Sequence, residues 1–518
     1  MLFNSFGFLF IFLPLALLGY QLAGLLGRRV VIVWLALMSL AFYAVWRAEF
    51  LWLLGGSVLF NYLCARLLVR FQHRARLQTA LMWTGICGNL LLLFYYKYLF
   101  PLLSGLGRLV TLHHQFAGVL LPLGISFFTF TQIAYLVDLR QGAADPQDLP
   151  SYVLFVTFFP HLIAGPILHH SEIMPQLQQQ RRYRLRADDV SIGLSWFIMG
   201  LFKKVFIADA IAPYADDAFA HPHALGLVPA WLGVLSYTMQ IYFDFSGYSD
   251  MAIGLARMFS IRFPLNFDSP YKAANIIDFW SRWHMTLTRY VTTYLYNPVS
   301  LAINRRRLAQ GKKVSRKGSA TLEGFSEMVA VPTLFSMLII GIWHGAGFQF
   351  LLFGLFHGVY ITINHAWRIF RRKKPEPGSA QARRMQVRWA QHAASVLLTM
   401  FCVVIGQVLF RADSTRGAFA MLASMGGAHG IQSAALAAGH VKLSVWLILL
   451  AAVVWLMPNT QQILARFESA EGVQPPTGWL GRHLLWQPNL TWALTLGIAL
   501  LLSLAFMENT SRFLYFQF

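Results

Sequence analysis

The chain has 518 residues, of which 57% are hydrophobic and only 12% are charged. Soluble domains carry about 25% charged residues, so this composition excludes an ordinary soluble enzyme, a disordered chain and a disulfide-rich secreted scaffold. A polytopic membrane protein is the class that fits. Lysine and arginine number 42 against 21 aspartate and glutamate, which gives a net charge of +21. In a membrane protein, basic cytoplasmic loops explain this excess more simply than nucleic-acid binding does.

A helix that crosses the hydrocarbon core needs about 20 mostly apolar residues. We count about thirteen candidate segments by this measure, some of which we expect to be re-entrant or too short to cross. They are residues 6–26, 30–46, 50–70, 80–104, 116–137, 150–168, 190–212, 228–258, 328–349, 351–368, 392–411, 443–457 and 490–507. The first has no basic region and no small-residue cleavage site, so we interpret it as a membrane helix rather than a signal peptide. We therefore expect one membrane domain over residues 1–518.

Basic residues gather between the predicted helices in four clusters, which the positive-inside rule places in the cytoplasm. The clusters are Arg66, Arg70, Arg74 and Arg76; Arg181, Arg182, Arg184 and Arg186; Arg305–Arg307 with Lys312, Lys313, Arg316 and Lys317; and Arg368 to Lys374 with Arg383, Arg384 and Arg388. A role in holding an anionic donor is the alternative interpretation. The loops near 140–150, 214–228 and 413–440 carry few basic residues and are predicted to be external.

Common catalytic and metal-binding motifs are absent from the sequence. Cys64, Cys87 and Cys402 lie in apolar runs, so neither a disulfide framework nor a zinc site is indicated. Spacings of the HExxH and CxxC kind are missing, and so are GxSxG, the P-loop and GxGxxG. We expect no bound metal or cofactor, and a transfer centred on histidine is the simplest chemistry left.

Polar residues are concentrated in the apolar segment 237–250, where Gln240, Asp244 and Asp250 stand close together with Ser246 and Ser249. Ionisable residues in membrane segments are expensive and usually mark function. We expect Gly247 to break the helix there. A polar network that fixes helix packing is the first interpretation, and direct contact with substrate is the alternative.

Two histidines lie in further segments of this kind. If residues 278–290 form one helix, Trp280, His284 and Thr288 share a face, while Arg282 and Arg289 share another. The surrounding tryptophans and tyrosines predict an interfacial aromatic belt. A structural role for His284 stays open.

His344 is flanked by glycines at 341, 345 and 347, which let other groups approach its backbone closely. His357 follows thirteen residues later, and Gly354 and Gly358 allow close helix contact. A buried histidine that is neutral at pH 7 is able to act as a general base. It is equally able to be a core histidine bonded to a backbone carbonyl.

Taken together, these segments resemble the membrane-bound O-acyltransferase (MBOAT) family, in particular its bacterial branch that includes the alginate O-acetylation membrane subunit. The resemblance covers nearly the whole chain. It rests on FLFIFLP at 8–14, PLGISFFTFTQ at 122–132, FPHLIAGPI at 159–167, GLFKK at 200–204, QIYFDFSGYSDMAIG at 240–254, FWSRWHMTLTRY at 279–290, GIWHGAGFQFLLFGLFHG at 341–358 and FRAD at 410–413. One departure is His169 after GPI, where many relatives carry Arg or Lys.

The resemblance implies an all-α fold of roughly 11–13 membrane helices around a central tunnel, some of them re-entrant or interfacial. It implies a catalytic His344, with His284 as its functional partner. Asp244, Gln240, Arg282 and Trp343 are weaker candidates for orienting the substrate.

The resemblance also implies the activity. We expect acetyl transfer from a cytoplasmic donor, acetyl-CoA, across a bacterial inner membrane to an exported polysaccharide such as alginate or cellulose. A separate periplasmic SGNH-type acetyltransferase is the expected protein partner, and we expect contact with membrane lipids but not with nucleic acid. Acylation of a lipid, a protein or peptidoglycan is the alternative. A proton-coupled transporter is a third possibility, against which no transporter-type internal repeat is visible.

Overall fold

The computed structural model describes residues 2–109, 120–179, 183–371, 381–431, 438–467, 473, 475–476, 481, 483–507 and 514. The chain divides into two compact units. The first comprises Met1–Ile207, Phe243–Leu265 and Thr460–Gln517, and the second comprises Ala208–Tyr242, Asn266–Asn459 and Phe518. All regular elements in the described residues are helices, and an isolated β-bridge joins Phe267 to Trp283. The prediction of an all-α fold is confirmed.

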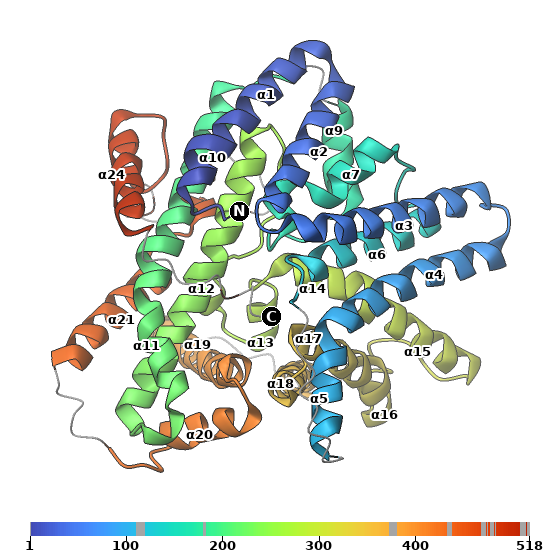
Figure 1. Cartoon of the computed structure of the whole chain (residues 1–518). Coiled ribbons are helices and arrows are strands. Elements are labelled where there is room, and N and C mark those ends of the chain that lie inside the picture. The colour runs from blue at the N-terminus through green and yellow to red at the C-terminus, as the bar shows by residue number, and fades with distance from the viewer. Residues whose placement is uncertain are drawn as a thin grey trace. The chain divides into compact units, whose positions relative to one another are not determined.

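The first unit contains the helices of the N-terminal part of the chain and two from its C-terminal part (Figure 1). In chain order they are η1 (Phe8–Phe12), α1 (Leu13–Leu26), α2 (Arg28–Ala44), η2 (Ala48–Phe50), α3 (Leu51–Arg70), α4 (Ala75–Phe94), η3 (Tyr95–Leu99), α5 (Phe100–Leu109), α6 (Ile125–Gln141), α7 (Leu149–Thr157), α8 (Phe159–Leu162), α9 (His170–Gln179), α10 (Ala187–Phe202), η4 (Lys203–Ala208), α22 (Thr460–Ile463) and α24 (Leu490–Phe506). The symbol η marks a 3₁₀- or π-helix.

The second unit contains the segments that carry His284 and His344. Its helices are α11 (Asp209–Ala220), η5 (Pro222–Ala224), η6 (Pro270–Lys272), α13 (Ile276–Trp280), α14 (Met285–Val291), η7 (Thr292–Tyr296), α15 (Asn297–Ala309), α16 (Leu322–Phe325), η8 (Ser326–Ala330), α17 (Val331–His344), α18 (Phe348–Phe370), α19 (Gln381–Arg411), α20 (Thr415–Met425) and α21 (Ala438–Leu456). Helix α12 (Leu227–Met258) contributes residues to both units.

Within the part of the chain that the structure describes, six helical segments are long and apolar enough to cross a membrane. They are Phe8–Leu26, Ala48–Arg70, Ala75–Ser104, Ala187–Ala220, Leu322–His344 and Trp389–Arg411. Their outward side chains include exposed leucine, phenylalanine and tryptophan, as a lipid-facing surface requires. The chain is therefore a multi-pass membrane protein. The segment predicted at 150–168 does not form one spanning helix, because α7 ends at Thr157 and the short α8 carries Pro160 near its start.

Gly247 does not break its helix, contrary to the sequence prediction. Helix α12 continues from Leu227 to Met258, and Gly247 instead lies against the end of α10. A Cβ on Gly247 would lie 2.7 Å from the carbonyl oxygen of Gly200, and one on Gly200 would lie 2.5 Å from the carbonyl oxygen of Gly247. Because neither glycine carries a side chain, the backbones of α10 and α12 pack directly against each other here.

The same device joins α17 to α18, as the sequence predicts. A Cβ on Gly341 would overlap the carbonyl oxygen of Phe350, and one on Gly354 would overlap that of Met337. On Gly358 a Cβ would lie 3.2 Å from the Cβ of Met337. The absence of side chains at these positions lets the two antiparallel helices pack closely, and this hairpin positions His344 at its tip.

Replacing Gly354 with alanine is expected to lower the melting temperature of the purified protein, because the new methyl overlaps a backbone oxygen that has no room to move. Overpacking of this kind costs about 1–3 kcal/mol. The matched control is Gly55→Ala in α3, where nothing lies within 4 Å of the added methyl. There the better helix propensity of alanine should leave stability unchanged or raise it by about 0.5–1 kcal/mol. Equal melting temperatures for the two variants would contradict the close packing of α17 and α18.

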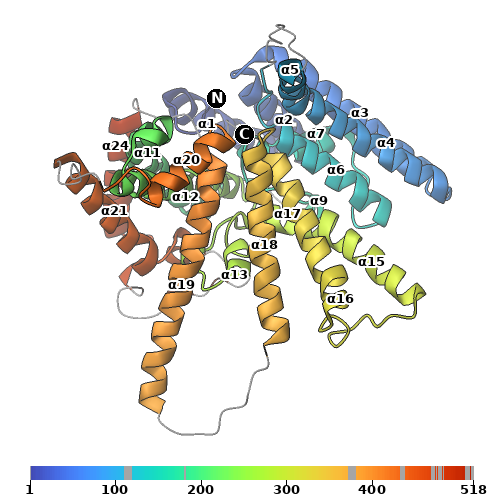
Figure 2. The same cartoon turned by 90° about the horizontal axis from the view of Figure 1, so that it is seen from below.

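Two of the basic clusters lie towards the same end of the second unit (Figure 2). The ring of Phe325 in α16 contacts that of Phe370 at the end of α18, with centroids 5.4 Å apart. The described parts of the clusters at 305–317 and 368–371 are therefore close to the start of the Leu322–His344 span. His344 is the last residue of that span, so it lies at the end opposite the basic residues. Arg181, Arg182 and residues 372–374 fall outside the described residues.

Candidate active site

His344 is the last residue of α17 and is only 5% exposed. The helix stops there because Gly345 takes an extended conformation, and a Cβ on Gly345 would overlap the ring of Phe350. The imidazole lies against aromatic rings on either side. Its centroid is 4.8 Å from that of Phe410, at the end of α19, and 4.7 Å from that of Trp343. The fold therefore places the histidine in an aromatic enclosure at a helix terminus.

A second histidine, His357, belongs to the same enclosure. The ring of Phe353 in α18 packs against both histidines, with centroids 5.9 Å from His344 and 4.7 Å from His357. The indole N–H of Trp280 donates to Nδ1 of His357 over 3.2 Å. Since indole only donates, Nδ1 carries the lone pair and the ring proton of the neutral imidazole resides on Nε2. The sequence analysis noted His357 without assigning it to the site.

The ring of His357 is tightly packed. A Cβ on Gly406 in α19 would overlap Nε2 of His357, so the ring fills the space that this glycine leaves open. With one nitrogen bonded to Trp280 and the other against a helix backbone, His357 is fixed on both sides. It connects α13, α18 and α19 behind His344.

The predicted helix over 278–290 is interrupted, which corrects the sequence prediction. Helix α13 ends at Trp280, and α14 begins at Met285, so Trp280, His284 and Thr288 do not share one helical face. Residues 266–268 pair with the intervening turn, where the N–H of Asp268 donates to the carbonyl of Arg282 and that of Met285 donates to the carbonyl of Asn266. Tertiary hydrogen bonds replace helical ones at this turn.

Arg282 pairs with carboxylates of both segments that meet at this turn. Its Nε donates to Asp278 over 2.8 Å, and its Nη1 lies 3.8 Å from a carboxylate oxygen of Asp268. Pairing with two carboxylates leaves the guanidinium in a fixed position between the two segments. These contacts join residues 268 and 278 to the turn that carries His284.

His284 adopts a left-handed backbone conformation with φ 45° and ψ 54°, which residues other than glycine rarely take. Such strain persists only where the surrounding structure imposes it, and it is concentrated at functional sites. The side chain is 1% exposed, and Nδ1 lies 2.9 Å from the side-chain oxygen of Asn266. The hydroxyl of Thr286 donates to the same oxygen over 2.9 Å.

This contact fixes the tautomer of His284. An amide oxygen only accepts, so Nδ1 carries the proton and Nε2 is the acceptor nitrogen. His284 lies outside the six membrane-spanning segments, and burial lowers its pKa to about 3. The imidazole is therefore neutral throughout the physiological range, with Nε2 unprotonated. Neither Asn266 nor its role was identified from the sequence, where an asparagine in a loop before a turn gives no distinguishing signal.

Replacing Asn266 with alanine is expected to lower the rate of acyl transfer about tenfold, since one hydrogen bond worth about 1.4 kcal/mol no longer orients the imidazole. The control is Asn489→Ala, which removes an exposed asparagine that caps α24 in the first unit, where its side-chain oxygen accepts from the N–H of Trp492. The rate should be measured in membranes with labelled donor, at matched protein levels. Equal rates for the two variants would show that Asn266 does not orient the site.

The remaining candidates are distributed over both units. Trp343 packs against His344, and Gln240 is 2% exposed on α12 in the second unit. Asp244 belongs to the first unit, where its carboxylate lies 2.6 Å from Nζ of Lys204 and accepts from the N–H of Leu514 over 3.0 Å. A buried carboxylate that is paired in this way serves packing, so the first interpretation of the 237–250 segment, a polar network, fits Asp244 better than substrate contact.

The neighbouring residues extend this network. Nζ of Lys203 lies 2.6 Å from the carboxylate of Asp250 and donates to the hydroxyl of Thr460 over 2.6 Å, and that hydroxyl donates in turn to Asp250 over 2.7 Å. The motifs GLFKK and FDFSGYSD thus meet as two ion pairs within the first unit. Within the described residues no three His, Cys, Asp or Glu side chains come together as a metal site.

Comparison with known proteins identifies the family. The sequence model of the membrane-bound O-acyltransferase family matches residues 125–312. The chain is 34% identical to a peptidoglycan O-acetyltransferase of Helicobacter pylori, over 100% of this chain and 98% of that protein. It is 35% identical to a probable alginate O-acetylase, AlgI, of Pseudomonas aeruginosa, over 82% of this chain and 75% of that protein.

A more distant similarity links it to a teichoic acid D-alanyltransferase of Bacillus subtilis, with 28% identity over 50% of this chain and 63% of that protein. The resemblance predicted from the sequence motifs is thus confirmed by relatives that align along the chain. One relative is 34% identical over the whole chain, and a membrane-spanning helix ends in a buried histidine. The chain therefore belongs to the membrane-bound O-acyltransferase family and is an O-acyltransferase.

Proposed function

We propose that the protein transfers an acetyl group from acetyl-CoA, on the cytoplasmic side of a bacterial inner membrane, to a carbohydrate hydroxyl outside. The observation that carries the proposal is the position of His344, buried at the end of its span opposite two basic clusters. Basic loops face the cytoplasm, so the histidine lies towards the external side, where an exported acceptor arrives. A passage for the donor across the membrane, the tunnel expected from the family, is part of this proposal.

The chemistry we propose is direct transfer with His344 as general base. A sugar hydroxyl is a poor nucleophile near pH 7, and proton removal during attack contributes about 10²–10⁴-fold. The imidazole of His344 accepts the hydroxyl proton while the oxygen bonds to the acetyl carbonyl carbon. The carbon–sulfur bond then breaks, and the departing thiolate takes the proton from the imidazolium. The products are an acetyl ester and free CoA. Transfer through an acetyl-histidine is the alternative route.

His284 is assigned the role of a positioning residue in this scheme. Since Asn266 fixes the proton on Nδ1, the Nε2 atom offers a lone pair, which suits accepting a hydrogen bond or relaying a proton rather than donating to the carbonyl oxygen. Trp343 and Gln240 are proposed to shape the enclosure around the acceptor.

Two acceptors have support from the names of the relatives. AlgI proteins are named as alginate O-acetylases, which suits an exported polysaccharide. The peptidoglycan O-acetyltransferase aligns over the full length of this chain, which specifically favours a cell-wall glycan as the second candidate. A periplasmic acetyltransferase is the proposed partner. Where it takes part, a hydroxyl of the partner accepts the acetyl group in place of the sugar hydroxyl, and the partner then passes the group to the polymer.

The experiment compares a deletion strain with the same strain complemented by the wild-type chain. Ester-linked acetate is released by mild base from purified exopolysaccharide and from purified peptidoglycan, and is then quantified. We expect complementation to restore acetate in one of the two polymers. Inside-out membrane vesicles supplied with labelled acetyl-CoA test the donor, and label should enter a trapped acceptor only when the chain is present.

Restoration in neither polymer would contradict the proposed acceptor class and direct attention to a lipid or protein acceptor. Coupled uptake of a solute without any ester formation would support the transporter alternative instead.

A further inference from the structure

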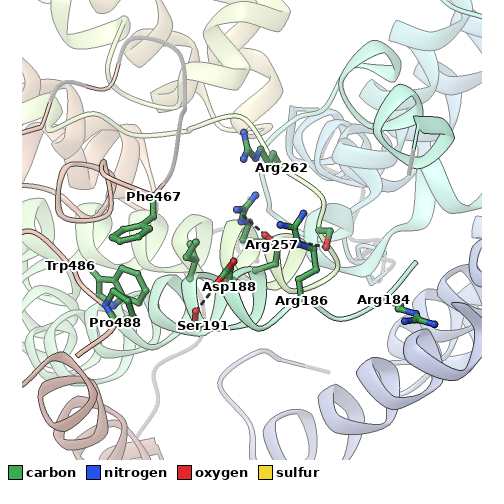
Figure 3. A pocket seen from close by; sticks show the side chains of 12 residues that line it. Arg184, Arg186, Asp188, Ser191, Arg257, Arg262, Phe467, Trp486 and Pro488 are labelled. Atoms are coloured by element: carbon green, nitrogen blue, oxygen red, sulfur yellow. Dashed lines mark hydrogen bonds and ion pairs between the residues drawn. The ribbon is translucent and has the colours of Figure 1, made fainter. Parts of the chain in front are cut away.

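A pocket of about 800 Å³ lies within the first unit, where α10 begins and α12 ends (Figure 3). All of its lining residues that the structure describes belong to the first unit, whereas His284 and His344 belong to the second. Its volume falls in the range of small-molecule sites, about 300–1,000 Å³. The acyl-transfer chemistry described above does not use it.

One wall of the pocket is basic. Arg184, Arg186 and Arg262 are exposed on it, and Arg257 is 7% exposed at its base. Nη2 of Arg257 lies 2.9 Å from a carboxylate oxygen of Asp189. The other carboxylate oxygen of Asp189 accepts from the hydroxyl of Ser260 over 2.6 Å. The carboxylate is thus bound on both sides and fixes the base of the pocket.

The charge on this wall remains positive after the acidic residues are included. Four arginines and two aspartates, Asp188 and Asp189, line the pocket, so the difference is 4 − 2 = +2. Arg184 and Arg262 extend beyond the reach of the Arg257–Asp189 pair (Figure 3). Planar guanidinium groups bind phosphate oxygens through paired hydrogen bonds, so this wall suits a phosphate group.

The opposite wall is aromatic. Phe467 and Trp486 lie together there, with ring centroids 5.1 Å apart and planes at 90° (Figure 3). Trp486 is 4% exposed, and its backbone N–H donates to the carbonyl of Ile463 over 2.8 Å, which anchors the wall to α22. An aromatic wall opposite a basic one suits a ligand with an apolar or flat group joined to a phosphate.

We propose that this pocket binds an organic phosphate, with the arginines on the phosphate and the aromatic pair on the attached group. Two sources carry this chemistry: the headgroup of an anionic phospholipid and the nucleotide part of a soluble donor such as CoA. The inference rests on the pocket alone and holds whether or not the proposed acetyl transfer is correct.

The test uses the full-length protein with Arg184→Ala and Arg262→Ala combined. Both side chains are exposed, and removing them leaves the Arg257–Asp189 pair intact, so the fold is expected to be retained. The matched control combines Arg305→Ala and Arg306→Ala, two exposed arginines on α15 that remove the same charge elsewhere. Melting temperatures verify that all three proteins are folded.

Two arms of the experiment distinguish the sources. In the first, CoA is titrated calorimetrically into protein in nanodiscs of pure phosphatidylcholine. In the second, retention of phosphatidylglycerol is measured by native mass spectrometry after purification from mixed lipid. Loss of charge-assisted hydrogen bonds should weaken binding about tenfold in the pocket variant and leave the control variant as wild type.

A tenfold loss for CoA alone assigns the pocket to a soluble nucleotide, and a loss for phosphatidylglycerol alone assigns it to a lipid headgroup. Wild-type binding of both probes by the pocket variant, an equal loss in the control variant, or no binding of either probe by the wild-type protein would each overturn the proposal.

Discussion

Replacing His344 with alanine is expected to lower acetyl transfer by at least about 100-fold, because general-base assistance of this size disappears with the imidazole. The residue is the end of α17, and its neighbours are the rings of Trp343, Phe353 and Phe410. Labelled acetyl-CoA and isolated membranes give the rate, with immunoblots to match protein levels.

The control for this prediction is His392→Ala, which removes an exposed histidine from α19. It should transfer acetyl groups at the wild-type rate. If His344→Ala restored acetylation fully in a deletion strain, the general-base assignment would be wrong and His344 would be a structural residue. A variant that fails to reach the membrane would show a folding role, which is why protein levels and melting temperatures accompany the rates.

The second large loss of activity is expected at His284. Two substitutions there separate the effect of backbone strain from the effect of losing the imidazole. His284→Asn retains a polar side chain and a residue type that tolerates the left-handed conformation, whereas His284→Ala places an ordinary residue at φ 45°. Both variants lack the imidazole, and we expect both to lose about 10–100-fold in acetyl transfer. We expect the asparagine variant to be the more stable of the two by about 1 kcal/mol.

The comparison of rate and melting temperature tests the assignment of His284. A functional histidine predicts equal losses of activity with unequal stabilities. If activity instead followed stability, so that His284→Asn remained fully active, the side chain would act only in packing. Ser269→Asn is a suitable control, since Ser269 has a left-handed conformation with φ 47° in the same unit.

The segment 278–290 shows where sequence patterns were insufficient. Its residues have a helical spacing, but the turn at 281–284 forms hydrogen bonds with residues 266–268 instead. Those bonds join residues 14 and 19 positions apart, whereas helical periodicity relates only neighbours within a few turns. The same limit explains Gly247, which the sequence suggested as a helix break and which proves to be a contact between α10 and α12.

The sequence by itself determined the class of the protein, its all-helical fold and its family. These follow from local and compositional properties: long apolar runs force helices, because backbone groups in lipid must bond within their own segment. The ordered motifs were sufficient to indicate His344 and His284. Gly354 and Gly358 also predicted a close helix pair correctly.

Only the tertiary structure decided how each histidine is held. The Trp280 indole selects the tautomer of His357, and the Asn266 amide selects that of His284. The tertiary structure also showed that Asp244 pairs with Lys204. These outcomes depend on which polar groups meet after helices from distant parts of the chain pack together. A buried polar group must find a partner, but its identity is fixed by geometry rather than by sequence spacing.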